Sequence, residues 1–306
     1  MRLIVMGQQA FGKSALEAIL EKGEDEVVAV YCAPDNDGRF DPIKEFSLER
    51  GLTVMQPDNF RSPDVLAAMS AFKSDLCVMA FVTLFVPQEA RNIPTKGSIC
   101  FHPSLLPLHR GPSSINWPII WGASKTGISY FWPDDGLDEG EILLQKEIDI
   151  GPDDTLGTVY FEKAFPMGIE ATLEAVDLVR GGNPPRVVQD ESKATYEGWC
   201  IRNVAEINWN NSVSEVYNLI RGCNPQPGAW TTFNGETLQI FDSEKFEHAA
   251  FGRVGQVVSV SEEGMLVTAG RGAILVRRVR YAGGKKVTAK EFADELGVDE
   301  GAKLGT

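Results

Sequence analysis

The first half of the chain alternates short apolar runs with segments of helical spacing. The apolar runs lie at residues 3–6, 27–32, 53–55 and 76–81. They are almost entirely apolar, as expected of strands that are buried on both faces of a parallel sheet. The segments with helical spacing lie between and around them, at residues 13–22, 43–50 and 62–73. This alternation predicts an α/β fold with a doubly wound, mostly parallel sheet.

The middle of the chain continues this alternation. Strands are expected over 127–132 and 142–148, and helices around 114–121 and over 155–180. Pro166 lies inside the last of these segments. Because proline removes a backbone donor and clashes with the preceding turn, we expect a kink or an interruption there.

From about residue 184 the pattern changes to short β segments separated by turns. We expect a helix around 213–220, a last helix or a frayed end over 287–296, and strands over 231–233, 238–241, 255–260, 264–269 and 273–281. Short strands of this kind are typical of a small antiparallel barrel. The sequence therefore predicts two domains, one over residues 1–200 and the other over residues 205–306.

Polar side chains gather where two of the apolar runs end. His102 ends the run that begins at Ser98, and Asp138 lies in the Pro- and Gly-containing stretch after residues 127–132. Each alone is an ordinary turn or loop residue. Open α/β sheets, however, place their sites at strand ends, and a carboxylate can orient an imidazole and raise its basicity. We therefore predict that His102 and Asp138 form the reaction centre.

Two neighbouring features add to this prediction. The stretch from Phe81 to Pro87 is rich in apolar side chains, which predicts either the wall of a pocket for a flat aromatic ligand or a core under a loop. Cys100 lies two positions before His102, so a covalent thiol mechanism is an alternative. A thiol inside an apolar strand is, however, more often packed than reactive.

Residues 7–14 match the phosphate-loop pattern GxxxxGK followed by Ser, between a strand and a helix. A nucleotide hydrolase also needs a second apolar strand that ends in a magnesium-holding Asp, and the run at 76–81 ends without a carboxylate. Phe11 is also bulky for a loop around a phosphate. We interpret Gly7 and Gly12 as parts of a tight first turn and keep nucleotide binding as an alternative.

Composition narrows the function classes. The formal net charge of -14 disfavours a nucleic-acid partner. One local basic patch leaves RNA binding as an alternative, and it consists of Arg271, Arg277, Arg278, Arg280, Lys285 and Lys286. The 5 cysteines are widely spaced without a CxxC motif, which indicates reduced thiols and no metal site. No apolar run reaches the roughly 18 residues that span a bilayer, so we expect a cytoplasmic protein with no membrane contact.

Three stretches together resemble the folate-dependent formyltransferases. They are His102-Pro103-Ser104-Leu105-Leu106-Pro107 with Arg110-Gly111, Asp135-Gly136-Leu137-Asp138-Glu139-Gly140, and Thr195-Tyr196. The resemblance covers nearly the whole chain. It implies a Rossmann-like formyl-transfer domain followed by an OB-like barrel, with 10-formyltetrahydrofolate as the formyl donor and no metal.

The resemblance also implies roles for individual residues. In this family the pterin lies between a loop that matches Phe81 to Phe85 and one that matches Asp134 to Asp138. The implied folate-binding residues are therefore Phe81, Val82, Leu84, Phe85, Asp134, Asp135, Gly136 and Leu137. Arg110 and Tyr196 are implied to bind the substrate. Asp138 would accept a proton from the attacking water or amine, and His102 would stabilise the oxyanion or protonate the leaving nitrogen.

Within the family the sequence is closest to the N-terminal hydrolase domain of the 10-formyltetrahydrofolate dehydrogenases, because of its short acidic loop at 34–42 and its Ser114-Ile115-Asn116-Trp117. Transferases of the family place an Asn two residues before the His, where this chain has Cys100. A thiol is a weak donor, so oxyanion stabilisation would depend on His102 or on backbone amides. Leu108, where many relatives have Arg, is a second departure.

These features favour water or a small amine as the formyl acceptor. A tRNA formyltransferase and a non-catalytic folate-binding module remain as alternatives. The likeness to the dehydrogenases also implies additional domains in the full-length protein.

Overall fold

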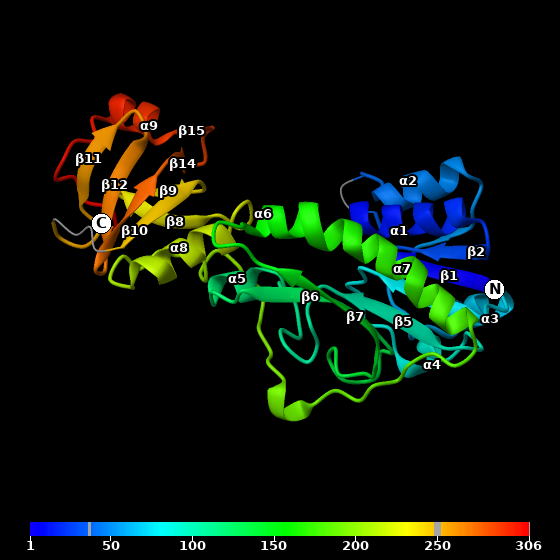
Figure 1. Ribbon diagram of the computed structural model, residues 1–306. Helices are drawn as coiled ribbons and strands as arrows, with labels where there is room; N and C mark the ends of the chain where they lie inside the picture. The colour runs from blue at the N-terminus through cyan, green and yellow to red at the C-terminus, as the bar shows by residue number, and fades with distance from the viewer. Residues whose placement is uncertain (36–37, 248–251, 306) are drawn as a thin grey trace. The chain divides into compact units, whose positions relative to one another are not determined.

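The structure is a computed structural model that describes residues 1–35, 38–247 and 252–305. The chain divides into two compact units (Figure 1). The first unit comprises residues 1–111, 127–148 and 163–196, and the second comprises residues 112–126, 149–162 and 197–306.

The first unit is built on a seven-stranded sheet with the strand order β3-β2-β1-β4-β5-β6-β7. The strands are β1 (Arg2–Gly7), β2 (Glu26–Tyr31), β3 (Val54–Met55), β4 (Leu76–Ala80), β5 (Ser98–His102), β6 (Lys125–Phe131) and β7 (Ile142–Asp149). The first five strands pair in parallel, and β6 is antiparallel to β5. This confirms the predicted doubly wound, mostly parallel sheet. The order reverses between β1 and β4, and such a switch point is where open α/β sheets bind ligands.

Helices cover both faces of this sheet. α1 (Gln9–Lys22) contacts α2 (Pro42–Glu49) and α7 (Phe165–Arg180), while α3 (Pro63–Ala71) contacts α4 (Gln88–Arg91). Successive residues of a strand point to opposite faces. Phe101 of β5 accordingly stacks on Phe11 of α1, with 4.3 Å between the ring centroids, and the adjacent Cys100 packs against the apolar cluster that contains Met69 of α3.

The predicted turn through Gly12 is wrong, because α1 already begins at Gln9. Gly7 ends β1, and a Cβ there would lie 2.7 Å from the carbonyl oxygen of Ala80; a Cβ on Gly12 would lie 3.0 Å from the carbonyl carbon of Gly7. The two glycines therefore allow α1 to pack directly against the ends of β1 and β4. No loop remains that could wrap a phosphate, which argues against the nucleotide-binding alternative.

The helical segment over 155–180 is interrupted, as its proline predicted. α6 (Leu156–Thr158) leads into the π-helical stretch η1 (Val159–Ala164), and α7 begins at Phe165 with Pro166 in its first turn. Because proline has no N–H to donate to the preceding turn, the regular α-helical hydrogen bonding is interrupted just before it, where the π-helical stretch lies. The interruption therefore lies at the start of α7 and leaves the remaining turns regular.

The second unit contains two four-stranded sheets, with the orders β10-β13-β12-β11 and β15-β14-β9-β8. Their strands are β8 (Ala229–Phe233), β9 (Glu236–Ile240), β10 (Ser243–Glu247), β11 (Val257–Ser261), β12 (Gly264–Ala269), β13 (Gly272–Val276), β14 (Arg278–Tyr281) and β15 (Lys286–Thr288). The helices of this unit include α5 (Asn116–Ile120), α8 (Val213–Gly222) and α9 (Ala289–Leu296). The pairings of these strands are antiparallel, and both sheets share one apolar core, so the unit is compatible with the expected OB-like barrel.

Three details of this unit differ from the sequence prediction. β10 and β15 were not expected, because charged side chains such as Glu244 and Lys286 interrupt their apolar pattern. The stretch 273–281 is not one strand but two, β13 and β14, which separate at Arg277.

Candidate active site

His102 and Asp138 lie together in the first unit. His102 is the last residue of β5 and is 7% exposed, and Asp138 lies in the loop between β6 and β7. Nδ1 of His102 is 3.6 Å from Oδ2 of Asp138. The structure thus brings the two predicted reaction-centre residues to one place at the end of the sheet. Their separation is longer than a hydrogen bond, as is common for catalytic pairs before a ligand binds.

The imidazole of His102 is fixed through its other nitrogen. Nε2 lies 2.9 Å from the carbonyl oxygen of His109. Because a carbonyl only accepts hydrogen bonds, Nε2 carries a proton and donates it. Nδ1 is therefore the nitrogen that faces Asp138 and is left for chemistry.

Asp138 is held in a left-handed backbone conformation, with φ of 58°. Asp is among the residues that tolerate this region. The backbone N–H of Gly111 donates to Oδ2 at 2.8 Å. Within the described part of the chain, Oδ1 has no hydrogen-bonding partner. It is therefore the oxygen that can bind a substrate or a water molecule.

Arg110 is completely buried, and its guanidinium is used within the protein. Its five N–H groups donate to the side-chain oxygen of Gln189, to the carboxylate of Glu191 and to the hydroxyl of Tyr196. Tyr196 in turn donates to Glu139 at 2.6 Å. The hydrogen bond to Glu191 raises the pKa of Arg110. Direct binding of a ligand by Arg110, as the resemblance implied, would require one of these bonds to break.

Gln189 is a site residue that sequence reasoning missed. It is 5% exposed, and its side-chain nitrogen donates to the carbonyl oxygens of Asp138 and Gly140 at 2.8 and 2.7 Å. It lies in the irregular connection after α7, where no periodic pattern distinguishes one polar residue from another. Only the folded chain shows that Gln189 reaches the loop of Asp138.

Arg91 of α4 was also missed, and it joins the two stretches that were predicted to hold the pterin. This residue is 6% exposed and donates to the carbonyl oxygen of Val86 at 2.7 Å and to the carboxylate of Asp135 at 2.6 Å. Asp134 accepts a hydrogen bond from the backbone N–H of Gly136. Leu137, which follows Gly136, is exposed, which leaves an apolar side chain available to a ligand.

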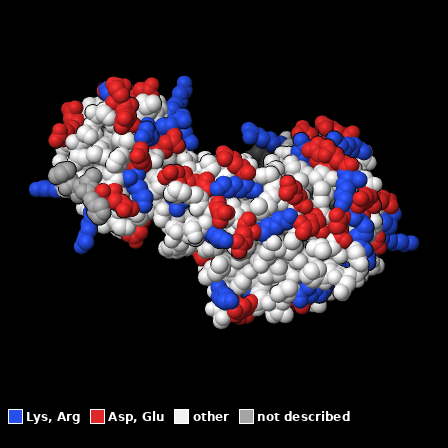
Figure 2. Space-filling view, in the orientation of Figure 1, with Lys and Arg blue, Asp and Glu red and all other residues white. Residues whose placement is uncertain are grey.

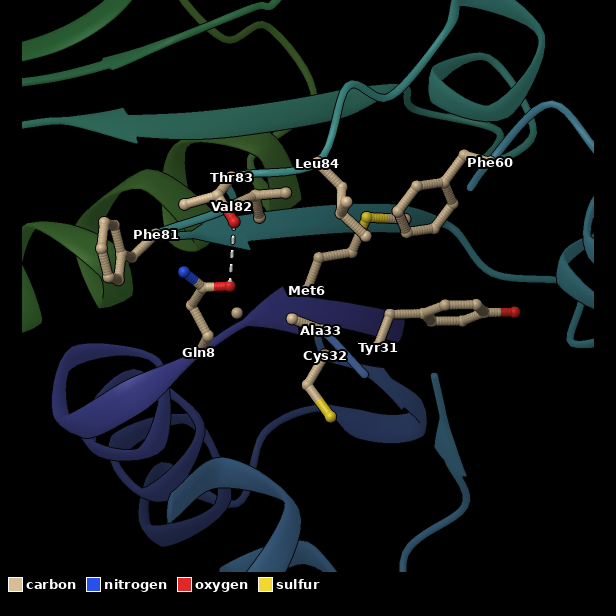
Figure 3. Close-up of a pocket in the computed structure, with 11 residues that line it drawn as sticks. Met6, Gln8, Tyr31, Cys32, Ala33, Phe60, Phe81, Val82, Thr83 and Leu84 are labelled. Carbon is tan, nitrogen blue, oxygen red and sulfur yellow. Dashed lines mark hydrogen bonds between the residues drawn. The ribbon is translucent and has the colours of Figure 1, made fainter. Parts of the chain in front are cut away.

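Phe81, Val82 and Leu84 line a small pocket at the switch point between β1 and β4 (Figure 3). Its volume is about 10 Å³, which is room for one water molecule. Thr83 donates to the side-chain oxygen of Gln8 at 3.2 Å across it. Phe81 has a φ of 64° and is 41% exposed, and Phe85 is 55% exposed without lining the pocket.

Cys100 is packed rather than activated. Burial raises the pKa of its thiol far above the ordinary value, and the nearby negative charge of Asp138 raises it further. The side chain packs against the small apolar cluster of Leu106, Phe131 and Ile142. Since the thiolate is the nucleophilic form, this environment argues against the covalent thiol alternative.

Residues 1–35, 38–247 and 252–305 contain neither a metal-binding group of side chains nor a membrane-spanning helix. Among these residues no three His, Cys, Asp or Glu side chains are grouped so that they could hold a metal ion. None of the helices in these ranges has the length and apolarity required to cross a bilayer.

Comparison with known proteins gives matches over both units. The formyl transferase family model matches residues 1–170, and the model of the formyl transferase C-terminal domain matches residues 201–297. The chain is 38% identical over 306 residues to the cytosolic 10-formyltetrahydrofolate dehydrogenase of Mus musculus, covering 95% of this chain but only 34% of that protein. It is 32% identical to the methionyl-tRNA formyltransferase of Acetivibrio thermocellus, covering 100% of both chains.

Solved structures agree in fold. HypX from Aquifex aeolicus, in complex with tetrahydrofolic acid, superposes with a TM-score of 0.68 at 18% identity, over 97% of this chain and 47% of that one. WlaRD, a sugar 3N-formyl transferase, superposes with a TM-score of 0.67 at 15% identity, over 90% of this chain and 97% of that one. On the evidence of the two family models and of the relative that matches end to end, the chain belongs to the formyl transferase family.

Proposed function

We propose that this chain transfers the formyl group of 10-formyltetrahydrofolate to water and releases formate and tetrahydrofolate. The observation that carries the proposal is the pairing of His102 with Asp138 at the end of β5, with Oδ1 of the acid left unoccupied by protein groups. A small amine is the other acceptor that this geometry supports.

In the proposed reaction the two side chains have different tasks. Asp138 binds the attacking water through Oδ1 and takes its proton as the water oxygen bonds to the formyl carbon. The carbonyl oxygen becomes an oxyanion, which His102 in its doubly protonated form stabilises through the proton on Nδ1. The bond between the formyl carbon and N10 then breaks, and His102 gives its proton to the leaving nitrogen. Positioned groups of this kind each contribute about a hundred- to ten-thousand-fold.

The donor would bind between residues 81–86 and 134–138, which Arg91 links. Phe85 and Leu137 are large apolar side chains left exposed on these stretches, and a pterin ring would cover them. Two proteins of similar fold support a folate as the ligand. HypX was solved with tetrahydrofolic acid, and WlaRD was solved in the presence of 5-N-formyl-THF.

Water is favoured over an amine by two observations. Cys100 stands where transferases of the family have an Asn, and its packed thiol is a weak donor to an oxyanion. Several of the relatives are 10-formyltetrahydrofolate dehydrogenases, including the human cytosolic protein at 42% identity over 248 residues. The chain spans about a third of the length of these proteins, so their complete activity is not carried over.

The test is to give the purified chain 10-formyltetrahydrofolate and to measure formate with no amine present. We expect formate and tetrahydrofolate in equal amounts, and a loss of at least about a hundredfold in rate for His102→Gln. Asp64→Asn, an exposed change on α3, is the control and should keep the wild-type rate. Formate that forms only after an amine is added would show a transferase instead.

Methionyl-tRNA formyl transfer is the second candidate, because the bacterial tRNA enzyme matches this chain over its full length. The second unit has a cationic sheet edge on which Arg280 pairs across strands with Lys286, and Lys286 lies 3.5 Å from the ring centroid of Phe241. Arg277 and Arg278 in the same patch are, however, paired with Glu244 and Asp242. In the view of Figure 2 acidic and basic side chains are also interspersed over both units.

Filter binding of initiator tRNA separates the two candidates. Because the chain has a net charge of -14 and its basic patch is partly neutralised, we expect no binding at physiological salt. Tight binding that weakens steeply with salt and is lost in Arg280→Ala would favour the tRNA enzyme.

A further inference from the structure

We propose that Gln189 is a positioning residue that sets the place of Asp138, an inference whose kinetic part rests on the proposed function. Gln189 is the buried amide whose side-chain nitrogen bonds the carbonyl oxygens of Asp138 and Gly140. The first is the carbonyl of the acid itself, and the second lies two residues further along the chain. A single side chain thus holds the backbone from the proposed base to Gly140.

The orientation of this amide is determined by its partners. Its oxygen accepts from Nε and Nη2 of Arg110 at 3.2 and 2.9 Å, and these groups can only donate. Its nitrogen faces two carbonyls that can only accept. Rotation of the amide by half a turn would therefore break four hydrogen bonds, so Gln189 has one working orientation.

Asp138 benefits from such support because its backbone lies in the left-handed region. Asp tolerates a φ of 58° but adopts it less readily than the ordinary regions, and surrounding contacts help to hold it. The carboxylate itself is held on one side only, by the N–H of Gly111. Gln189 supplies the hydrogen bonds that fix the backbone from which this carboxylate projects.

Arg110 holds the side chain of Gln189 in place. It is wholly buried, and its remaining N–H groups bond Glu191 and Tyr196. Because every N–H of the guanidinium is bonded, Arg110 has no competing position to adopt. The line of contacts from Arg110 through Gln189 to the backbone of Asp138 is continuous, so a change at Gln189 should reach the acid directly.

The test uses Gln189→Glu in the complete chain. This variant keeps an oxygen for Arg110 but replaces both N–H donors by an oxygen that faces the two carbonyls. Gln239→Glu is the matched control, because Gln239 also accepts from an arginine, Arg280, and donates to a backbone carbonyl, that of Pro227, on a strand of the second unit. Gln189→Asn, which keeps both groups on a shorter side chain, covers the case in which the Glu variant does not fold.

The first measurement is amide hydrogen exchange, which needs no activity. The N–H of Gly111 should exchange at least about tenfold faster in Gln189→Glu, because the carboxylate that it bonds has moved. The backbone N–H of Arg110, which donates to the carbonyl of Thr195, should exchange at the wild-type rate in Gln189→Glu and in the control Gln239→Glu. Unchanged exchange at Gly111 in folded Gln189→Glu or Gln189→Asn would overturn the proposal.

The second measurement is the rate of formate release. A displacement of about 1 Å in a catalytic group costs on the order of a hundredfold, so we expect kcat to fall about ten- to a hundredfold with KM nearly constant. In an Asp138→Asn background the same change should have no further effect on the residual rate, because Gln189 acts through Asp138. An equal fall in both backgrounds would contradict the role. If the wild-type chain released no formate, the proposed function would fail, and the exchange result would still decide the position of Asp138.

Discussion

Two loops of the first unit flank the candidate site, and they are built in opposite ways. The acid loop (residues 133–140) is bonded from several directions, by Gln189, by Arg91 and by the N–H of Gly111. The apolar loop (residues 81–87) has few such bonds, and its Phe81 and Phe85 are exposed. One loop holds a carboxylate in place, and the other presents apolar rings without fixing them.

This difference corresponds to two kinds of task. A proton-transferring group contributes only when it is already placed, since small errors of position cost large factors in rate. A wall for a flat ring gains from contact area, and it can adapt as the ligand binds. We therefore expect changes in the acid loop to reduce kcat, and changes in the apolar loop to raise KM.

The largest effect is expected for Asp138→Asn. The amide cannot accept the proton of the attacking water, so kcat should fall by about a hundred- to ten-thousand-fold. The N–H of Gly111 can still donate to the amide oxygen, so the melting temperature should change by no more than a few degrees. Steady-state kinetics measures kcat, and thermal unfolding measures the melting temperature. A variant that keeps more than a tenth of the wild-type kcat would exclude Asp138 as the base.

Arg110→Met should have the largest effect on stability. The change leaves the buried oxygen of Gln189 without a donor, which costs about 1–3 kcal/mol, and it also removes the hydrogen bonds to Glu191. Urea unfolding measures the loss. The control is Arg277→Met, which breaks an exposed ion pair to Glu244 and should cost less than about 1 kcal/mol. Equal losses of unfolding free energy in the two variants would mean that the buried hydrogen bonds of Arg110 stabilise the fold no more than an exposed ion pair does.

The loss in Arg110→Met should also depend on pH. The hydrogen bond from Arg110 holds the pKa of Glu191 below its ordinary value. A carboxyl with a lowered pKa stabilises the fold above its unfolded pKa, and this contribution disappears as the pH falls through the folded pKa. The stability difference between wild type and Arg110→Met should therefore narrow in acid. A difference that widens below neutral pH would contradict the pairing.

Arg91→Met should mainly affect folate binding, because Arg91 joins the two loops through Val86 and Asp135. Loss of the link lets the loops separate before the donor binds, so we expect KM to rise about tenfold, which corresponds to about 1.4 kcal/mol. The effect on kcat should be less than about threefold. Arg50→Met is the control, since Arg50 lies over the ring of Phe46 on α2, at 3.5 Å from its centroid, and pairs with Glu17. A fall in kcat with constant KM would show that Arg91 serves the acid loop alone.

The sequence predicted those parts of the fold and the site that depend on apolar runs. His102 ends an apolar run, as predicted. β6 is antiparallel to β5 and ends opposite Cys100, so strand order alone does not bring Asp138 to His102; the loop that follows Phe131 has to turn back toward it. The parallel sheet was predictable, because fully apolar runs separated by helices leave few other arrangements.

The parts that were missed depend on side chains from irregular segments. Gln189 lies in a connection without periodicity, and Arg91 lies in a helix of 4 residues. Their roles come from tertiary contacts with carbonyl groups, which leave no pattern along the chain. The start of α1 was missed because Gly7 and Gly12 suggested a turn, whereas the structure uses both glycines for close packing.

The smallest expected effect concerns the backbone of the apolar loop. Phe81 has a φ of 64°, and such a conformation costs a side-chain-bearing residue about 1–2 kcal/mol. Phe81→Ala and Phe81→Gly both remove the ring, but only glycine relieves this cost. We therefore expect the Gly variant to be the more stable by about 1 kcal/mol in urea unfolding, although glycine ordinarily destabilises relative to alanine. At Phe85, whose φ is not positive, the ordinary order should hold, with Ala at least as stable as Gly.

Both Phe81 variants should raise KM about two- to threefold, roughly 0.4–0.7 kcal/mol, because part of the apolar wall is lost. If Ala were more stable than Gly at both positions, the apolar loop would carry no strain, and the contrast between the two loops would reduce to their hydrogen bonds.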